Sequence, residues 1–172
     1  MISLHDLLES RDKRAEMQKD LLGKYPGKSL LCLTVLLPGS EKRNARSLVI
    51  ARAAVEAIRE RFSPDEVLLR DLETGYEGFF VVRDNALEAK GKAVEIEDSH
   101  PLGRLMDIDV ITPDGPLGRH EVGLGPRPCL ICGKPARVCM RARTHTQEQL
   151  LEVIEDKVDN FLLSSQSCRS DV

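Results

Sequence analysis

The chain has 172 residues, of which 41% are apolar and 31% are charged. A chain of this length and composition buries enough apolar surface to fold, so we expect one domain over residues 1–172 and exclude a disordered protein. The formal net charge is −3, and aromatic residues make up only 3% of the chain. These values argue against a nucleic-acid-coating protein, because that binding needs a basic face and rings for base stacking.

The N-terminus and the cysteines predict a cytoplasmic protein. The first residues, MISLHDLLES, contain acidic side chains and no apolar signal-peptide core. No apolar run approaches the roughly 20 residues that span a bilayer, so we expect no membrane partner. Cys129, Cys132 and Cys139 fall close together within an odd total of 5 cysteines, which suits a reducing compartment better than a secreted disulfide framework.

The first half of the chain predicts two helices, a central strand and a hairpin. Leucines at near-helical spacing follow Ser3 and Asp6, which resemble a capping box. The run SLLCLTVLL is continuously apolar and too short for a buried helix, so it predicts a strand covered on both faces. In chain order, these elements are a helix over 3–22, the strand over 29–37, a helix over 41–62, and strands over 67–72 and 78–82.

The second half predicts further strands and a final helix. The strand LMDIDVI alternates apolar and acidic residues, the turn TPDG follows it, and Thr146 with Gln149 forms a second capping box. The expected elements are a helical turn or more over 86–90, a strand starting at 93–96, strands over 105–111 and 119–124, and a helix over 147–163. Together they predict an α+β fold, with a mixed and mostly antiparallel sheet and flanking helices.

Asp107 and Asp109 form the strongest chemical pattern. At positions i and i+2 of a strand they project from one face, with Cα atoms roughly 7 Å apart, so both carboxylates can reach one Mg²⁺ ion. A solvated strand face is the alternative for a bare D-x-D pattern. If residues 119–124 form the return strand of a hairpin, Glu121 lies beside the pair as a third acid.

Several residues near the pair suit phosphate binding. Gly103 offers close backbone approach, the guanidinium of Arg104 matches phosphate geometry, and His100 and Arg119 flank the strand. A surface or capping role is the alternative for the histidine.

Two blocks of sequence resemble the apo-citrate lyase phosphoribosyl-dephospho-CoA transferase family, also called citrate lyase holo-acyl-carrier-protein synthase. The first block is SHPLGRL, DIDV and TP-x-G over residues 99–115, and the second is RPCLIC followed by Ala136, Cys139, Arg141 and His145. The N-terminal LLESRD over residues 7–12 and the Pro38-Gly39 loop extend the resemblance over most of the chain.

The resemblance implies a nucleotidyltransferase with two substrates. It would move the prosthetic group of 2′-(5″-triphosphoribosyl)-3′-dephospho-CoA onto a serine of the citrate lyase acyl carrier protein, and release diphosphate. Asp107 and Asp109 would hold Mg²⁺, Glu121 would complete the site or take the serine proton, and Arg104 with His100 would hold the triphosphate. The carrier of malonate decarboxylase is an alternative acceptor.

The wider nucleotidyltransferase-like fold is left open. Polymerase-β-type enzymes carry a Gly-Ser pair shortly before the D-x-D strand, whereas Gly39-Ser40 lies far upstream here. This pair follows a strand, so its amides and Lys42 suit phosphate binding at a helix N-terminus, with an ordinary turn as the alternative.

The segment 127–145 has the ligand types of a structural zinc site. Cys129, Cys132, Cys139 and His145 have spacings compatible with tetrahedral Zn²⁺. Alternatively, the segment buries small thiols while its arginines, Arg141 among them, face phosphate or the carrier protein. A noncatalytic zinc module that binds protein is the competing interpretation of the whole chain.

Overall fold

The structure is a computed structural model and describes residues 2–167. A five-stranded sheet has the order β2-β3-β1-β4-β5, and every strand pairing in it is antiparallel. The α+β class is therefore confirmed, whereas the nucleotidyltransferase-like fold stays a prediction. The elements are α1 (Leu4–Lys24), β1 (Ser29–Val35), α2 (Ala45–Phe62), β2 (Glu66–Leu72), β3 (Gly75–Val82), α3 (Ala86–Ser99), the 3-10 helix η1 (Gly103–Leu105), β4 (Met106–Thr112), β5 (Gly115–Pro116), the 3-10 helix η2 (Arg119–Val122), α4 (Ala136–Ala142) and α5 (Gln147–Ser167).

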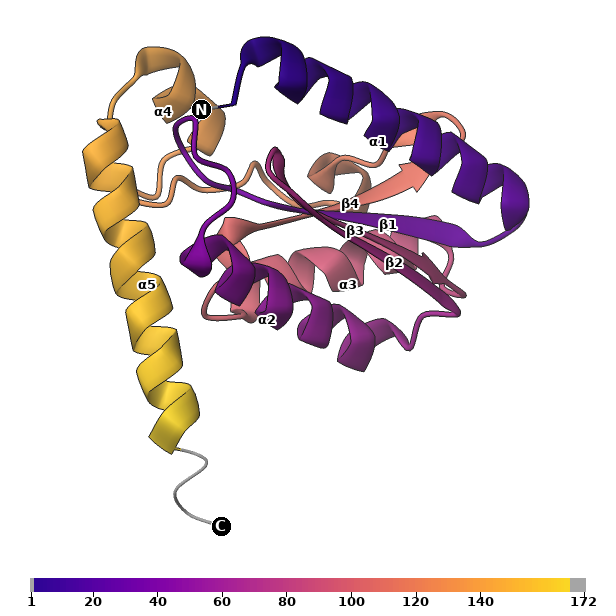
Figure 1. Cartoon of the computed structure of the whole chain (residues 1–172). Helices are drawn as coiled ribbons and strands as arrows, with labels where there is room; N and C mark the ends of the chain where they lie inside the picture. The colour runs from indigo at the N-terminus through magenta and orange to yellow at the C-terminus, as the bar shows by residue number, and fades with distance from the viewer. Residues whose placement is uncertain (1, 168–172) are drawn as a thin grey trace.

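Helices cover both faces of the sheet, as Figure 1 shows. Helix α1 lies on one face and packs Leu21 against Leu30 and Phe79. On the other face, α2, α3 and α5 pack around the larger core, to which β1 contributes Leu31 and Leu33. The prediction that β1 is a central strand covered on both faces is confirmed.

Side-chain caps fix the starts of the helices. Ser3 and Asp6 form the predicted capping box of α1, and Thr146 and Gln149 exchange the two bonds predicted at α5. Helix α2 begins at Ala45, later than predicted, because Asn44 provides its N-cap. Residues 36–44 are therefore a loop.

Two predicted strands are wrong. The residues 93–96 belong to α3, because Ala89, Ala93 and Ile96 recur at helical spacing and bury one face of that helix. Residues 119–124 form η2 and a turn in place of a return strand. The hairpin of β2 and β3 and the strand β4 are confirmed.

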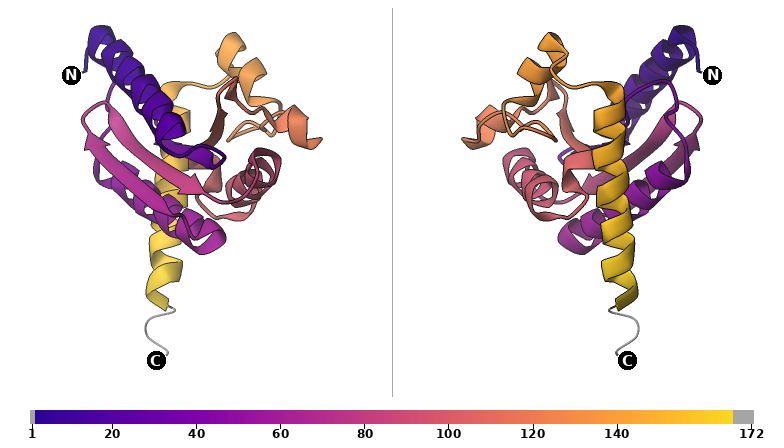
Figure 2. Two further views of the ribbon diagram at one scale, coloured as in Figure 1. Left: turned by 90° about the vertical axis from the view of Figure 1, so that its right-hand side faces the viewer. Right: turned by 90° about the vertical axis from the view of Figure 1, so that its left-hand side faces the viewer.

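Helix α5 crosses one end of the sheet, as Figure 2 shows. It packs on α2, where Arg46 and Glu155 form an ion pair of 3.0 Å. Its buried residues Ile154 and Val158 join the larger core. Within the described part of the chain, no helix combines the length and apolar character needed to cross a bilayer.

Candidate active site and Cys/His cluster

Asp107 and Asp109 project from the same face of β4. Met106, Ile108 and Val110 between and around them are completely buried in the core, so the predicted alternation is confirmed. Antiparallel pairing with the central strand β1 fixes the register of β4. The two carboxylates are thus held on a rigid element.

The carboxylates of Asp107 and Asp109 repel each other. Burial raises the pKa of Asp109, and the negative charge of Asp107 raises it further. Asp107 bonds to Nη1 of Arg127 at 3.0 Å, whereas Asp109 forms no ion pair with any described residue. A bound cation would relieve this repulsion, so the donor set fits a hard divalent ion.

The outer edge of β4 lacks the predicted partner strand. Strand β5 is only two residues long, and Pro116 has no N–H to extend the ladder. The carboxylate of Glu121 accepts a hydrogen bond of 2.5 Å from the amide of Gly118, which helps to form η2. The register argument that placed Glu121 opposite the aspartates is therefore wrong.

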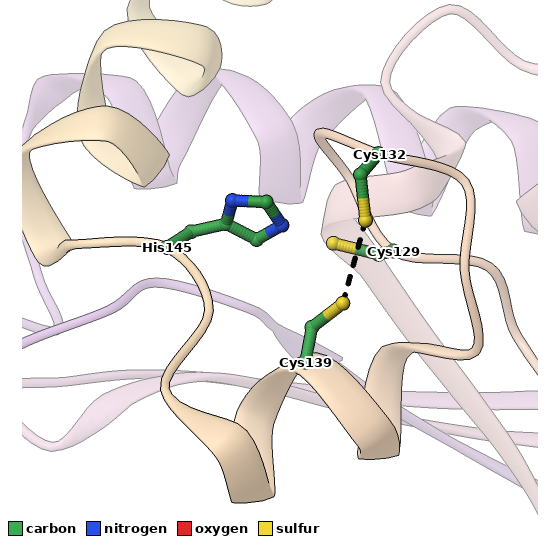
Figure 3. Close-up of side chains that lie close together, drawn as sticks. All are labelled: Cys129, Cys132, Cys139 and His145. Atoms are coloured by element: carbon green, nitrogen blue, oxygen red, sulfur yellow. Dashed lines mark hydrogen bonds between the residues drawn. The ribbon is translucent and has the colours of Figure 1, made fainter.

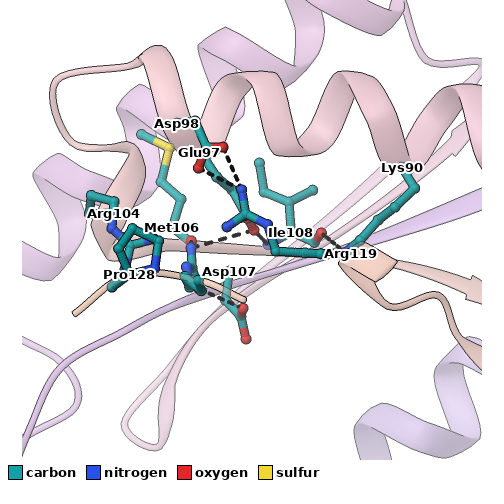
Figure 4. Close-up of polar contacts among 10 residues, drawn as sticks. Lys90, Glu97, Asp98, Arg104, Met106, Asp107, Ile108, Arg119 and Pro128 are labelled. Carbon is teal, nitrogen blue, oxygen red and sulfur yellow. Dashed lines mark hydrogen bonds and ion pairs between the residues drawn. The ribbon is translucent and has the colours of Figure 1, made fainter. Parts of the chain in front are cut away.

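Side chains take the place of that strand, as Figure 4 shows. Ile108 donates its N–H to Oε1 of Glu97 at 2.9 Å and accepts from Nζ of Lys90 at 3.4 Å. Arg127 donates to the carbonyl of Met106. These bonds matter because an unpaired backbone group at a buried edge costs about 1–3 kcal/mol.

Two of these side chains, Glu97 and Arg127, belong to an ion-pair network beside β4 that also includes Arg119, Asp98 and Asp107. Besides Asp107, Arg127 reaches Glu97, at 3.5 Å. Arg119 donates to both carboxylate oxygens of Asp98, at 2.6 and 2.5 Å, and lies 4.0 Å from Glu97. Burial raises the pKa of Glu97, and the charge of Arg127 opposes that rise. Arg127 therefore offsets part of the cost of burying the Glu97 carboxylate.

Arg104 has no such acidic partner. Its Nη2 donates to the carbonyl of Pro128, and it forms no ion pair with any residue of the described range 2–167. Burial lowers the pKa of Arg104, and the nearby charges of Arg127 and Arg119 lower it further. A bound anion would offset this concentration of positive charge.

A cavity of about 810 Å³ lies beside these arginines. Its walls come from the loop 36–38 after β1, from η1, from the segment 127–146 and from the start of α5. Arg104 and Arg127 line it together with apolar side chains. This size and lining are typical of sites for small molecules.

Gly103 and His100 have structural contacts near this cavity. A Cβ at residue 103 would lie 2.5 Å from the carbonyl oxygens of Ile96 and Glu97, so glycine lets η1 pack on the end of α3. The centre of the His100 ring lies 5.5 Å from the centre of the Phe161 ring on α5, and burial lowers the pKa of His100. Neither residue lines the cavity.

Lys42 and Arg141 also lie outside the cavity lining. Lys42 donates to the carbonyl of Leu37 at 2.5 Å and borders a separate pocket of about 180 Å³. Because Asn44 caps the helix after it, Lys42 is in a loop and not at the predicted helix N-terminus. Arg141 is exposed on α4.

Cys129, Cys132, Cys139 and His145 converge on one point, as Figure 3 shows. Their ligand atoms all lie within 4.8 Å of one another, and the sulfurs of Cys132 and Cys139 are 3.4 Å apart. This cluster could bind a metal ion such as zinc, because three thiolates and an imidazole complete a tetrahedral site.

Local backbone geometry builds the cluster. Gly133, at φ +72°, turns the chain between Cys132 and α4, and the amide of Cys129 bonds to the carbonyl of Lys134 at 2.6 Å. Although burial opposes it, hydrogen bonds from the backbone of Cys132 and Ile131 lower the pKa of Cys129 to about 6. A thiolate, which is the form that binds metal, is therefore favoured.

Lys90 and Glu97 are the site residues that the sequence analysis missed. Both are buried on the face of α3 that packs against β4. A signal was present, since they are seven residues apart and share a helix face with Ala93 and Val94. Charged residues on an apolar stripe indicate buried partners.

Comparisons with known proteins identify the family. The family described as apo-citrate lyase phosphoribosyl-dephospho-CoA transferase matches residues 2–161. The chain belongs to this family. It is 37% identical over 160 residues to the apo-citrate lyase phosphoribosyl-dephospho-CoA transferase of Escherichia coli O1:K1, covering 90% of this chain and 87% of that protein. The family resemblance predicted from the two sequence blocks is confirmed.

Two further relatives support the assignment to the citrate lyase transferase family. The probable apo-citrate lyase phosphoribosyl-dephospho-CoA transferase of Streptococcus pyogenes serotype M18 is 35% identical over 178 residues, covering 99% of this chain and 93% of that protein. Protein CitXG of Haemophilus influenzae is 36% identical over 165 residues. That match covers 92% of this chain but only 35% of CitXG, so this chain corresponds to one part of the longer protein.

Proposed function

We propose that this chain transfers the phosphoribosyl-dephospho-CoA group from its triphosphate precursor to a serine of the citrate lyase acyl carrier protein. The reaction forms a bond between the serine oxygen and the α-phosphorus and breaks the bond between the α-phosphorus and the oxygen that bridges it to the β-phosphate. Diphosphate and the proton of the serine hydroxyl are released. Membership of the family supports this function. The observation that carries it is the pair Asp107 and Asp109 on β4, next to Arg127 and the cavity.

Asp107 and Asp109 would hold Mg²⁺. The mutual repulsion of the two carboxylates and the exposed fraction of 37% at Asp107 fit an accessible cation site. When bound, the ion would supply Lewis-acid stabilisation of charge on the transferring phosphate. Asp107 and Asp109 would fix the position of the ion, because they project from β4. The register of this strand cannot shift without exposing its core face.

The arginines bind and orient the triphosphate. Arg104 has no carboxylate partner, so its guanidinium can pair with phosphate oxygens without breaking an ion pair. Arg127 is fixed by Glu97 and Asp107 and lies between the cavity and β4. Positive charge held there stabilises the departing diphosphate. His100, Lys42, Arg119 and Arg141 lie away from the cavity lining and would act only through these residues or on the carrier protein.

The experiment that tests the metal requirement uses intact-mass measurement of the carrier. Purified chain, apo carrier and triphosphate donor are mixed after EDTA treatment, and Mg²⁺ or Zn²⁺ is then added back separately. We expect no transfer after chelation, recovery with Mg²⁺, and no recovery with Zn²⁺ alone. Full transfer in excess EDTA would contradict the proposed Mg²⁺ site.

The Cys/His cluster would hold a structural Zn²⁺ ion. All four protein ligands are present, which is typical of a closed structural site and leaves no position for a substrate. Such an ion would tie the 127–135 loop to α4 and to the start of α5. A reducing, cytoplasmic location suits this assignment, because oxidised thiols do not bind zinc.

A further inference from the structure

The residues that line the cavity of about 810 Å³ are of two chemical kinds, here called its charged part and its apolar part. Arg104, Arg127 and Arg143 supply guanidinium groups along its lining, whereas Leu37, Leu130 and other apolar side chains form the rest. A ligand that matches both parts carries several phosphates at one end and a less polar body at the other.

The charged part has unmet hydrogen-bonding capacity. Nη1 of Arg104 and Nε of Arg127 are buried and have no hydrogen-bond acceptor among the described residues. Each such donor costs about 1–3 kcal/mol unless a partner is supplied. Phosphate oxygens accept several hydrogen bonds from guanidinium groups, so a polyphosphate offers what the protein leaves missing.

The charged part also lies toward the aspartate pair. Arg127 lines the cavity, and its Nη1 donates to Asp107 at 3.0 Å. The start of β4, where Met106 accepts from the same guanidinium, is therefore next to the cavity. A phosphate bound to Arg127 would be near the proposed Mg²⁺ ligand Asp107.

The apolar part is built from segments far apart in the sequence. Leu37 follows β1, Leu130 lies in the Cys/His segment, and Leu150 and Ile154 belong to α5. Because Ile154 is only 3% exposed and Leu37 only 7%, the floor of the cavity is part of the folded core. Such a surface is preformed and binds a ligand without a large ordering cost.

We infer that this cavity is the binding site of the triphosphate donor. The triphosphate lies against Arg104, Arg127 and Arg143, and the dephospho-CoA body lies against the apolar wall of Leu37, Leu130 and Leu150. This inference rests on the proposed function for the identity of the ligand. It adds Arg143 and the apolar wall to the residues that hold the substrate.

The test separates the two parts of the site with two probes. Binding of inorganic triphosphate and of dephospho-CoA is measured by titration calorimetry with the zinc-loaded chain. Replacing Arg104 by Gln should lower the affinity for inorganic triphosphate at least about tenfold, since a charge-assisted hydrogen bond contributes about 1.5–3 kcal/mol. Leu150→Trp should lower the affinity for dephospho-CoA at least about tenfold, because the larger side chain narrows the apolar part of the cavity. The affinity of this variant for inorganic triphosphate should stay within about threefold of the wild-type value.

Arg52→Gln is the matched control, since Arg52 is exposed on α2 and does not line the cavity. It should change neither affinity. Arg143 is exposed, so Arg143→Gln provides a second charge variant if Arg104→Gln fails to fold. It should also lower the affinity for inorganic triphosphate. Thermal melting identifies variants that fold.

The outcomes distinguish this inference from the proposed function. If the wild-type chain modifies the carrier while Arg104→Gln, Arg143→Gln and Leu150→Trp bind both probes normally, the donor site is elsewhere and the inference is overturned. If the probes bind in the cavity as expected but no carrier is modified, the proposed function fails and the cavity remains a nucleotide site.

Discussion

Arg127 joins the parts of the candidate site. It contacts Asp107, Glu97 and the carbonyl of Met106, and it also lines the cavity. The sequence analysis included this arginine only in the alternative to a zinc site, among the arginines of segment 127–145 that would face phosphate or the carrier protein. Its contacts with Glu97 could not be predicted, because they depend on α3 lying along the edge of β4.

Removing Arg127 should make the stability of the fold depend more strongly on pH. Burial already raises the pKa of Glu97 above its ordinary value of 4.5, and Arg127 opposes this rise. In Arg127→Met the folded-state pKa of Glu97 rises further, so the folded chain binds a proton that the unfolded chain releases. Melting temperature relative to wild type should therefore fall as pH rises above about 4.5.

The double variant Arg127→Met with Glu97→Gln provides the control for that measurement. It lacks the buried carboxyl, so the added pH dependence should disappear while some stability is lost through the missing bonds to β4. An Arg127→Met melting temperature that follows the wild type across pH 5–8 would show that Glu97 does not depend on Arg127 for its charge.

Asp107→Asn and Asp109→Asn should each lower turnover at least about a hundredfold, because Asn keeps the shape and removes the charge that holds the cation. Asp109→Asn should not lower the melting temperature. The folded-state pKa of Asp109 is above its ordinary value, so ionised Asp109 costs stability at neutral pH and Asn removes that cost.

Asp114→Asn is the matched control for the aspartate variants, since Asp114 is exposed in the turn after β4. Its turnover should equal that of the wild type. Steady-state transfer rates and melting curves for the three variants check both statements. Wild-type turnover and unchanged Mg²⁺ dependence in Asp107→Asn or Asp109→Asn would exclude the pair as cation ligands.

At the scale of elements, the sequence predicted what short-range patterns determine. The alternation of β4, the hairpin of β2 and β3 and both capping boxes are found as predicted. The errors arose where local preference and tertiary contact disagree. Val94 and Ile96 favour a strand locally, yet both are buried on α3, where Ile96 shares one face with Ala89 and Ala93.

The expected return strand failed for a related reason. An unpaired edge is usually covered by another strand, but here Lys90, Glu97 and Arg127 satisfy the edge groups of β4. Glu121 therefore caps η2 through the amide of Gly118. Nothing in the order of residues 112–124 indicates that side chains from α3 would replace the ladder.

The Cys/His segment gives a prediction at the same scale. Protein purified without added metal should contain about one equivalent of zinc per chain, and removing it should lower the melting temperature, since the ion ties a loop to two helices. Cys132→Ser should lose the zinc. Cys32→Ala should keep it, because Cys32 is buried in the sheet and outside the cluster.

Elemental analysis of these two variants and of the wild type measures the metal content directly. Less than about a tenth of an equivalent in repeated wild-type preparations would refute a zinc site, given the affinity expected of four such ligands. The segment would then be stabilised by packing alone.

At the scale of the whole molecule, the site forms where separate segments meet. The loop after β1, the 3-10 helix η1, the segment 127–146 and α5 all line the cavity. The sequence predicted the aspartates and the cluster ligands, because each set lies within a short stretch. It did not predict the cavity, because the residues that line it range from Leu36 to Ile154 and are brought together only by tertiary packing.

The central claim is transfer of one prosthetic group to one carrier serine. The most direct measurement combines the intact mass of the citrate lyase apo carrier with the amount of diphosphate released, with the malonate decarboxylase carrier tested in parallel. We predict that the citrate lyase carrier gains the mass of one phosphoribosyl-dephospho-CoA group for each diphosphate released, and that replacing its acceptor serine by Ala abolishes both. Modification of the malonate decarboxylase carrier alone, or of neither carrier, would contradict the proposed function.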